Sequence, residues 1–163
     1  MKTLLILRHA KSSWNNAQLT DYERPLNKRG KQDAPRMGKL LRQEDLVPDL
    51  IITSSAERAL ATAEAVALAS GYEEEIRATR SLYHADPAAY VDVLSQLDDS
   101  HERVMVVGHN PGMEELVEEL TGAWEVLPTA ALVQVSLPVT HWRELAEGVT
   151  GELVNLWRPK ELG

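Results

Sequence analysis

Arginine and histidine recur together in three short segments, each directly after an apolar run of strand length. The segments are Arg8-His9, residues 54–58, which end in Arg58, and residues 108–111, which contain His109. Ligand crevices in open α/β sheets lie outside the carboxyl ends of the strands. We therefore expect two arginines and two histidines to converge at one edge of a sheet.

These four side chains have complementary chemistry toward a phosphoryl group. Arg8 and Arg58 each present a forked, permanently charged set of donors that matches phosphate oxygens. A neutral ring nitrogen of His9 could attack phosphorus if its other nitrogen were protonated and held by an acceptor. His109 could donate a hydrogen bond to a non-bridging oxygen in the transition state. Water would then release phosphate from phosphorylated His9.

Each residue taken singly has an ordinary structural explanation. A lone arginine at a strand end is usually solvated or ion-paired, and a lone histidine is usually a surface residue or a hydrogen-bonded core residue. Gly108-His109-Asn110-Pro111 also reads as a simple turn. The combination favours a site, and we interpret the remaining histidines, His84, His101 and His141, as surface or turn residues. The four tryptophans and four tyrosines are expected to serve packing.

A metal centre is the competing explanation for paired histidines. The sequence has no cysteine and no His-x-x-x-His or His-Glu-x-x-His spacing. We therefore predict neither a metal site nor any other cofactor.

The elements that position these residues follow an alternating pattern. Strands are predicted at residues 4–7, 48–53, near 76, at 104–107, 131–137 and 152–157, with a long loop at 10–26. Asn27 should cap one helix, Ser54 or Ser55 a second that ends before Gly71, and Asp86 a third that begins with Pro87. A fourth helix follows Pro111. The pattern predicts a three-layer α/β/α fold, with a mostly parallel central sheet and helices on both faces.

Length and composition set the broader expectations. The 163 residues should form a single domain, 1–163, and no apolar stretch approaches membrane-spanning length. A net charge of −8 disfavours nucleic acid as a partner, so any phosphate pocket must concentrate arginine locally. We expect a cytoplasmic monomer that binds neither membrane nor nucleic acid.

Several of these segments together resemble the histidine phosphatase (phosphoglycerate mutase-like) superfamily. The matching segments are Leu5-Ile6-Leu7-Arg8-His9-Ala10, Lys11-Ser12-Ser13-Trp14-Asn15, Arg24-Pro25-Leu26-Asn27-Lys28-Arg29-Gly30, Ser54-Ser55-Ala56-Glu57-Arg58-Ala59 with Thr62, and Val107-Gly108-His109-Asn110-Pro111. The last has the form typical of the short SixA-like phosphohistidine phosphatases. The resemblance implies a phosphoglycerate mutase-like fold, with His9 as nucleophile and Arg8, Arg58 and His109 as its phosphate pocket. It also implies substrate-binding roles for Asn15, Ser12 and Asn110.

One departure from the superfamily bears on the substrate. Many members carry an acidic residue after the third strand that protonates the leaving oxygen, but Leu82-Tyr83-His84-Ala85 contains no carboxylate, and Asp86 is better explained as a helix cap. An alkoxide leaving group benefits from such an acid, whereas a phosphorylated imidazole can leave as a neutral ring after protonation by solvent. The leading hypothesis is therefore a phosphatase for phosphohistidine in a signalling or phosphotransfer protein.

Two alternatives stay open. One is a phosphatase for small phosphate esters, in which His84, Asp86 or a water supplies the proton. The other is a non-catalytic module that binds phosphorylated ligands through the same arginines.

Overall fold

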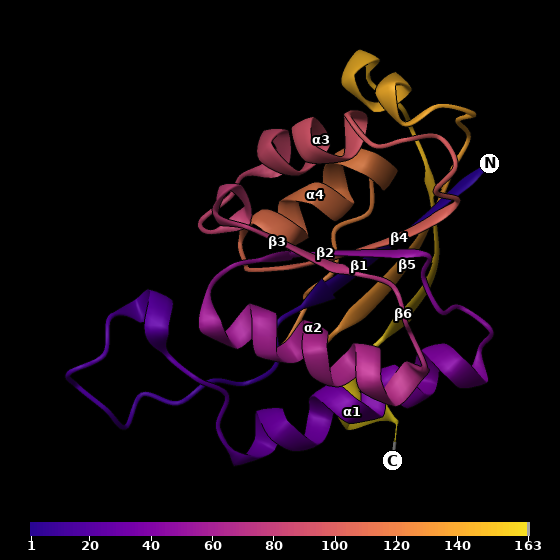
Figure 1. Ribbon diagram of the computed structural model, residues 1–163. Helices are drawn as coiled ribbons and strands as arrows, with labels where there is room; N and C mark the ends of the chain where they lie inside the picture. Colours follow the sequence, from indigo (N-terminus) through magenta and orange to yellow (C-terminus); the bar gives the residue numbers. More distant parts are fainter. Residues whose placement is uncertain (163) are drawn as a thin grey trace.

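The computed structural model describes residues 1–162, which form a six-stranded sheet in the order β3-β2-β4-β1-β5-β6 (Figure 1). The strands are β1 (Lys2–Arg8), β2 (Leu50–Ser54), β3 (Ile76–Thr79), β4 (Arg103–Gly108), β5 (Leu132–Leu137) and β6 (Glu152–Trp157). β3, β2, β4 and β1 pair in parallel, and β5 runs antiparallel to both of its neighbours. The predicted, mostly parallel sheet is confirmed.

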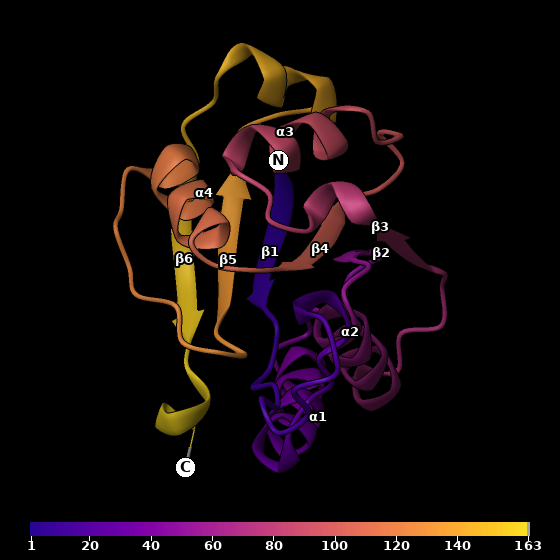
Figure 2. The same cartoon turned by 90° about the vertical axis from the view of Figure 1, so that its left-hand side faces the viewer.

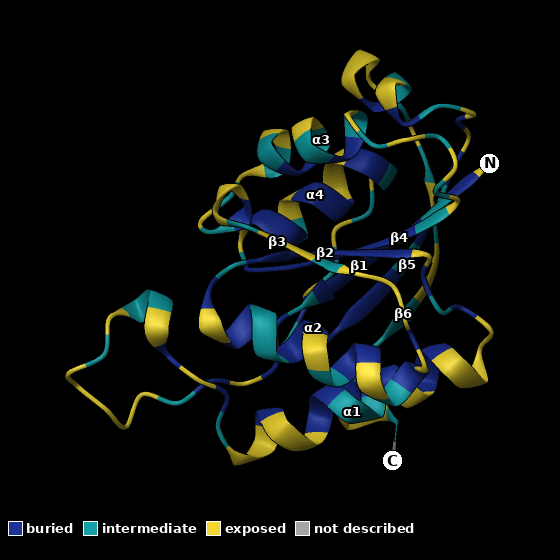
Figure 3. Cartoon of the chain, in the orientation of Figure 1, coloured by how far each residue is buried: buried dark blue, intermediate teal, exposed yellow. Residues whose placement is uncertain are grey.

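Two helices cover each face of this sheet. Helices α1 (Lys28–Gln43) and α2 (Glu57–Ser70) pack on one face, and α3 (Pro87–Ser95) and α4 (Gly112–Thr121) cover the other, as Figures 1 and 2 show. A 3-10 segment, η3 (Trp142–Glu147), lies beside α3 and α4. Each face has its own apolar core, so the inner helix surfaces and the central strands are buried while the outer surfaces are exposed (Figure 3). The three-layer prediction is therefore confirmed.

The caps of these helices follow the sequence, with one correction. The side chain of Asn27 accepts the Gly30 N–H at the start of α1, that of Asp86 accepts the Ala89 N–H at the start of α3, and Gly71 ends α2 with a positive φ of 83°. The predicted serine cap of α2 is wrong, because Ala56 occupies the N-cap position without a side-chain hydrogen bond. Ser54 lies two residues earlier, at the end of β2, where its hydroxyl is available to the neighbouring strand end.

The strand register brings the three candidate segments to one edge. Arg8 at the end of β1 pairs with Gly108 at the end of β4, and Thr53 of β2 pairs with Val107. The segment from Ala10 to Leu26 leaves this edge as a long loop that includes one short 3-10 turn, η1 (Asp21–Glu23) (Figure 1). No helix within residues 1–162 is long and apolar enough to span a bilayer.

Candidate active site

The carboxyl ends of β1, β2 and β4 form a pocket of about 390 Å³. Arg8, His9, Arg58 and His109 all line it, so the structure brings together the four residues singled out as candidates for catalysis. The remaining lining residues are Lys11, Ser12, Trp14, Asp21, Arg24, His84, Asn110 and Thr129. Three arginines in one small pocket create a local positive field in a chain of net charge −8.

His9 is held in one tautomer by its own backbone segment. Its Nδ1 lies 2.7 Å from the carbonyl oxygen of Ala10, which can only accept, so Nδ1 carries the proton and Nε2 keeps a lone pair. The amide of Ala10 is in turn fixed by Thr62 Oγ1 at 3.0 Å. Burial, and then the positive charges of Arg58, Arg8 and Arg24, lower the pKa of His9 to about 4 against the opposing effect of the Ala10 hydrogen bond. The ring is therefore neutral near pH 7.

His109 lies beside His9, with 5.1 Å between the ring centroids. Its Nε2 is 2.8 Å from the hydroxyl of Ser54, and its buried Nδ1 has no hydrogen-bond partner among residues 1–162. Burial, followed by the proximity of His9 and Arg58, lowers the pKa of His109 to about 3. A buried polar atom without a partner is unusual in a folded protein, and a functional role is one established reason for it.

The two predicted arginines are anchored in different ways. Arg8 donates through Nη1 to the carbonyl oxygen of Leu127 at 2.9 Å, while its buried Nε lacks a partner within the described chain. Arg58 is 6% exposed, and both terminal nitrogens of its guanidinium group donate to Asp21. Its Nη1 donates to the Asp21 carbonyl oxygen at 2.7 Å, and its Nη2 donates to Oδ2 at 3.0 Å.

Asp21 organises a network that the sequence did not predict. Its carboxylate pairs with Arg24 at 2.8 Å and Arg58 at 3.0 Å, and it accepts the Tyr83 hydroxyl at 2.6 Å. Burial alone would raise the pKa of Asp21, but the hydrogen bonds from Tyr83, Arg24 and Arg58 hold it well below its ordinary range. No motif or periodicity marks Asp21, because it lies in an irregular loop and meets Arg58 37 residues away.

Arg24 is the third arginine of the pocket. Its Nη2 donates to Ser12 Oγ at 2.5 Å, its Nε donates to the Ser13 carbonyl oxygen at 3.1 Å, and the ring of Trp14 lies against its guanidinium. Trp14 is 75% exposed, so it packs on this guanidinium at the surface of the protein and not in the core. The signal for Arg24 was its place directly before Pro25-Leu26 in the resemblance.

The three residues predicted to bind substrate have different positions. Ser12 and Asn110 line the pocket, and Asn110 donates through Nδ2 to the Leu127 carbonyl oxygen at 2.8 Å while its buried Oδ1 has no partner in residues 1–162. Asn15 is exposed and is not among the residues that line the pocket.

His84 and Asp86, the two candidate proton donors, differ in position. His84 is an exposed turn residue, as expected, and it also lines the pocket, stacked on Tyr83 with 3.9 Å between ring centroids. It also has a positive φ of 55°. Asp86 caps α3 and is not a lining residue.

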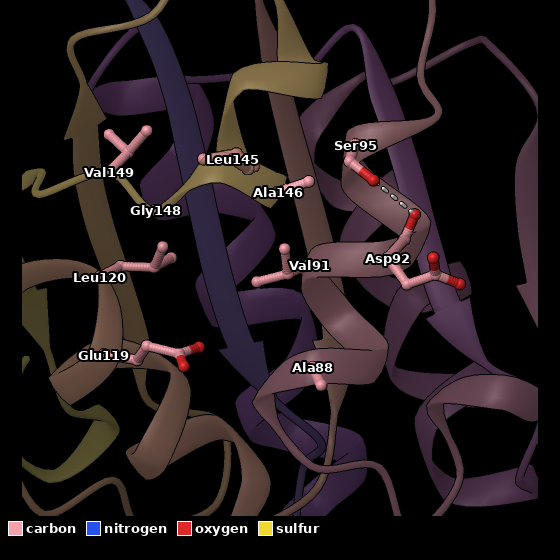
Figure 4. A pocket seen from close by; sticks show the side chains of 10 residues that line it. All are labelled: Ala88, Val91, Asp92, Ser95, Glu119, Leu120, Leu145, Ala146, Gly148 and Val149. Carbon is pink, nitrogen blue, oxygen red and sulfur yellow. Dashed lines mark hydrogen bonds between the residues drawn. The ribbon is translucent and has the colours of Figure 1, made fainter.

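Another hollow, of about 370 Å³, lies between α3, α4 and η3 (Figure 4), but its lining is mostly aliphatic, with Ser95 and two carboxylates, Asp92 and Glu119, that would repel a phosphate dianion. Residues 1–162 contain no group of three or more His, Cys, Asp or Glu side chains arranged to hold a metal ion.

Comparison with known proteins identifies the family. Residues 4–86 match the histidine phosphatase superfamily (branch 1). This chain belongs to the histidine phosphatase superfamily. An uncharacterised chloroplastic protein of Arabidopsis thaliana is 33% identical over 144 residues, a match that covers 82% of this histidine phosphatase chain and 66% of the relative.

Solved structures agree with the family. The protein assigned as phosphohistidine phosphatase SixA in Agrobacterium tumefaciens is 26% identical, with a TM-score of 0.83 over 97% of this chain and 98% of that one. The protein histidine phosphatase SixA complexed with tungstate shares the fold, with a TM-score of 0.86, 22% identity and 99% of both chains covered. The mycobacterial glucosyl-3-phosphoglycerate phosphatase also shares the fold, at a TM-score of 0.72 and 17% identity over 96% of this chain and 98% of that one. The histidine phosphatase fold therefore accommodates more than one substrate class.

Proposed function

We propose that this histidine phosphatase removes phosphate from phosphohistidine in a signalling or phosphotransfer protein, with His9 as the nucleophile and without a metal ion. The observation that carries the proposal is the fixed tautomer of His9, whose Nδ1 is bound to the Ala10 carbonyl oxygen at 2.7 Å inside a pocket of three arginines. A neutral Nε2 is thereby available beside the charges that would hold a dianion.

The reaction has two displacement steps. Nε2 of His9 attacks phosphorus, the bond from phosphorus to the substrate nitrogen breaks, and its electron pair returns to the substrate imidazole, which takes a proton from solvent. Water then attacks phosphorus, the bond to Nε2 breaks with its electron pair returning to His9, and the proton of water passes to solvent. The Ala10 carbonyl oxygen stabilises the positive charge that the ring carries while phosphorylated.

The other pocket residues stabilise the transferring group. Arg8 and Arg58 supply positive charge to the non-bridging oxygens, as arginine clamps do in phosphoryl transfer. The Ser54 hydroxyl accepts the Ala56 N–H at 3.2 Å, so its own proton can be donated to Nε2 of His109. That arrangement leaves a proton on the unpartnered Nδ1 of His109, ready for a phosphoryl oxygen.

The leaving group that suits this site is a nitrogen base. Asp21, the only carboxylate among the described lining residues, is ion-paired with two arginines, and its lowered pKa keeps it ionised, so it has no proton to give. Asp86 uses its carboxylate to cap α3. An alkoxide is a poor leaving group here, because neither carboxylate can protonate it. A phosphorylated imidazole that is protonated by solvent leaves as a neutral ring.

One observation supports the second candidate, a phosphatase for small phosphate esters. His84 lines the pocket and stacks on Tyr83, so it could donate a proton to an ester oxygen. In that case turnover of an alkyl ester would depend on His84.

Three substrates separate the candidates: a phosphohistidine-bearing protein, an aryl phosphate and an alkyl phosphate of similar size. We expect kcat/KM to fall in that order, with the alkyl ester at least about 100-fold below phosphohistidine, the range that general acid catalysis usually provides. Alkyl-ester turnover that equals phosphohistidine turnover and collapses in His84→Gln would support the ester phosphatase instead. Phosphate binding without turnover of any substrate would indicate a binding module.

A further inference from the structure

A second basic hollow adjoins the active-site pocket. It has a volume of about 230 Å³ and shares Lys11 and Thr129 with that pocket. Its other lining residues are Arg29, Asp33, Pro128, Pro159 and Lys160. We call this hollow the side pocket. The side pocket and the phosphoryl pocket are therefore adjacent, because Lys11 and Thr129 line both.

The walls of the side pocket are fixed by backbone contacts. The Asn27 N–H donates to the Lys11 carbonyl oxygen at 3.0 Å, and Gly30 is needed because a Cβ there would overlap that carbonyl group. Arg36 Nη2 donates to the Pro159 carbonyl oxygen at 3.1 Å, which ties the C-terminal wall to α1. The loop that carries Pro128 and Thr129 is anchored where the Ala130 N–H donates to the His9 carbonyl oxygen at 3.0 Å. The hollow is therefore a built feature of the fold.

Positive charge in the side pocket exceeds what its carboxylate can neutralise. Asp33 is 4% exposed and is bound by Arg29 at 3.0 Å and by Arg36 at 3.3 Å. Lys11 and Lys160 make no side-chain hydrogen bond or ion pair with residues 1–162. Two ammonium groups without a partner in the described part of the chain, in a protein of net charge −8, create a local attraction for an anion.

We propose that the side pocket binds a second anionic group of the substrate, a carboxylate or a phosphate, while the transferred phosphoryl group lies against His9. The inference rests on the proposed function for the position of the transferred group. It adds a substrate class, namely phosphorylated molecules with a second anion close to the first. That anion can be an acidic side chain near phosphohistidine or the second charge of a small molecule.

The test compares matched pairs of substrates with one and two anionic groups. One arm uses phosphohistidine peptides with either an acidic or a neutral neighbouring residue, and the other uses small aryl and alkyl phosphates with and without a carboxylate at varied spacing. We expect KM for the best two-anion substrate to be about threefold to tenfold lower than for its partner, as one or two partly exposed ion pairs would give. The arm that shows the advantage identifies the source of the anion.

Two charge-reversal variants test whether the lower KM for two-anion substrates depends on the side pocket. Lys160→Glu reverses a charge in the side pocket, and Lys39→Glu makes the same change at an exposed position on α1 that lines neither pocket. We expect Lys160→Glu to remove the two-anion advantage and Lys39→Glu to retain it. An advantage that is absent in the wild type, or equal in the two variants, overturns the inference. These outcomes leave the proposed function untouched. The proposed function is contradicted by a different result, namely turnover of the one-anion substrates by His9→Ala.

Discussion

Asp21 Oδ2 lies 3.0 Å from Nη2 of Arg58, so the pocket holds a carboxylate against one of the arginines that would bind phosphate. Arg24 shares the same carboxylate at 2.8 Å. The ion pairs orient both guanidinium groups, and they also place a negative charge where a dianion must bind. Asp21 therefore fixes the orientation of Arg24 and Arg58 and weakens the binding of a dianion.

Asp21→Asn should strengthen the binding of phosphate analogues. The amide keeps one side-chain acceptor where the carboxylate has two, and it removes the negative charge, so we expect the Kd of tungstate to fall by about threefold to tenfold. Isothermal titration calorimetry would measure the Kd of tungstate for wild type, for Asp21→Asn and for the surface control Asp98→Asn. Weaker tungstate binding in Asp21→Asn alone would mean that orientation of the arginines outweighs charge.

Asp21→Asn should lower the free energy of unfolding by an amount that depends on pH. The lowered pKa of Asp21 in the folded state contributes stability above its unfolded pKa near 4, and this contribution is lost as the pH falls through the folded value. Asp21→Asn should therefore be less stable than wild type at pH 7, and the difference should shrink below about pH 4. Urea unfolding at both pH values tests this, and a difference independent of pH contradicts it.

His9 and His109 should make the protein less stable in mild acid. Their folded pKa values, about 4 and about 3, are below the ordinary value of 6.5, so the unfolded chain binds more protons in between. Stability should fall as the pH decreases from about 6.5 to about 4, because each histidine takes up a proton more readily in the unfolded chain. His9→Asn should show roughly half this slope in urea unfolding, and a slope equal to that of wild type would contradict the assignment.

Ser54→Ala should slow the reaction by removing the group that orients His109. We expect kcat to fall about tenfold, with a smaller change in KM, because a hydrogen bond to the transition state is weakened. Nitrogen chemical shifts of His109 should report a mixture of ring tautomers, which a purely structural effect would not produce. Ser100→Ala is the control, since Ser100 is exposed and lies outside the pocket. Unchanged kcat with a single His109 tautomer in Ser54→Ala would contradict the role.

The strand ends and most helix caps could be predicted because their causes are local. Apolar runs of strand length mark β1, β2 and β4, and residues after parallel strands share an edge, so convergence of Arg8, Arg58 and His109 follows from topology alone. Asp86 before Pro87 is likewise a local signal for a helix start.

The loop from Ala10 to Leu26 could not be predicted in the same way. Its conformation depends on ion pairs such as Asp21 to Arg58, which join residues far apart and leave no periodic trace. The position of Ser54 was misread for a related reason, because its hydroxyl serves His109, 55 residues away, and not the start of α2. His84 is exposed in a turn, as expected, but its place among the pocket-lining residues was not predicted, since its contact with Tyr83 and its positive φ have no pattern in the sequence.

The most direct test of the account is whether His9 carries phosphate during turnover. Rapid acid-free quenching and intact-mass analysis of wild type with a phosphohistidine-bearing protein, in the presence of a metal chelator, should show one added phosphoryl group that maps to His9. His9→Ala should show neither the phosphorylated enzyme nor turnover, while His101→Ala should behave as wild type. Full turnover by His9→Ala, or loss of wild-type activity in chelator, would contradict the account.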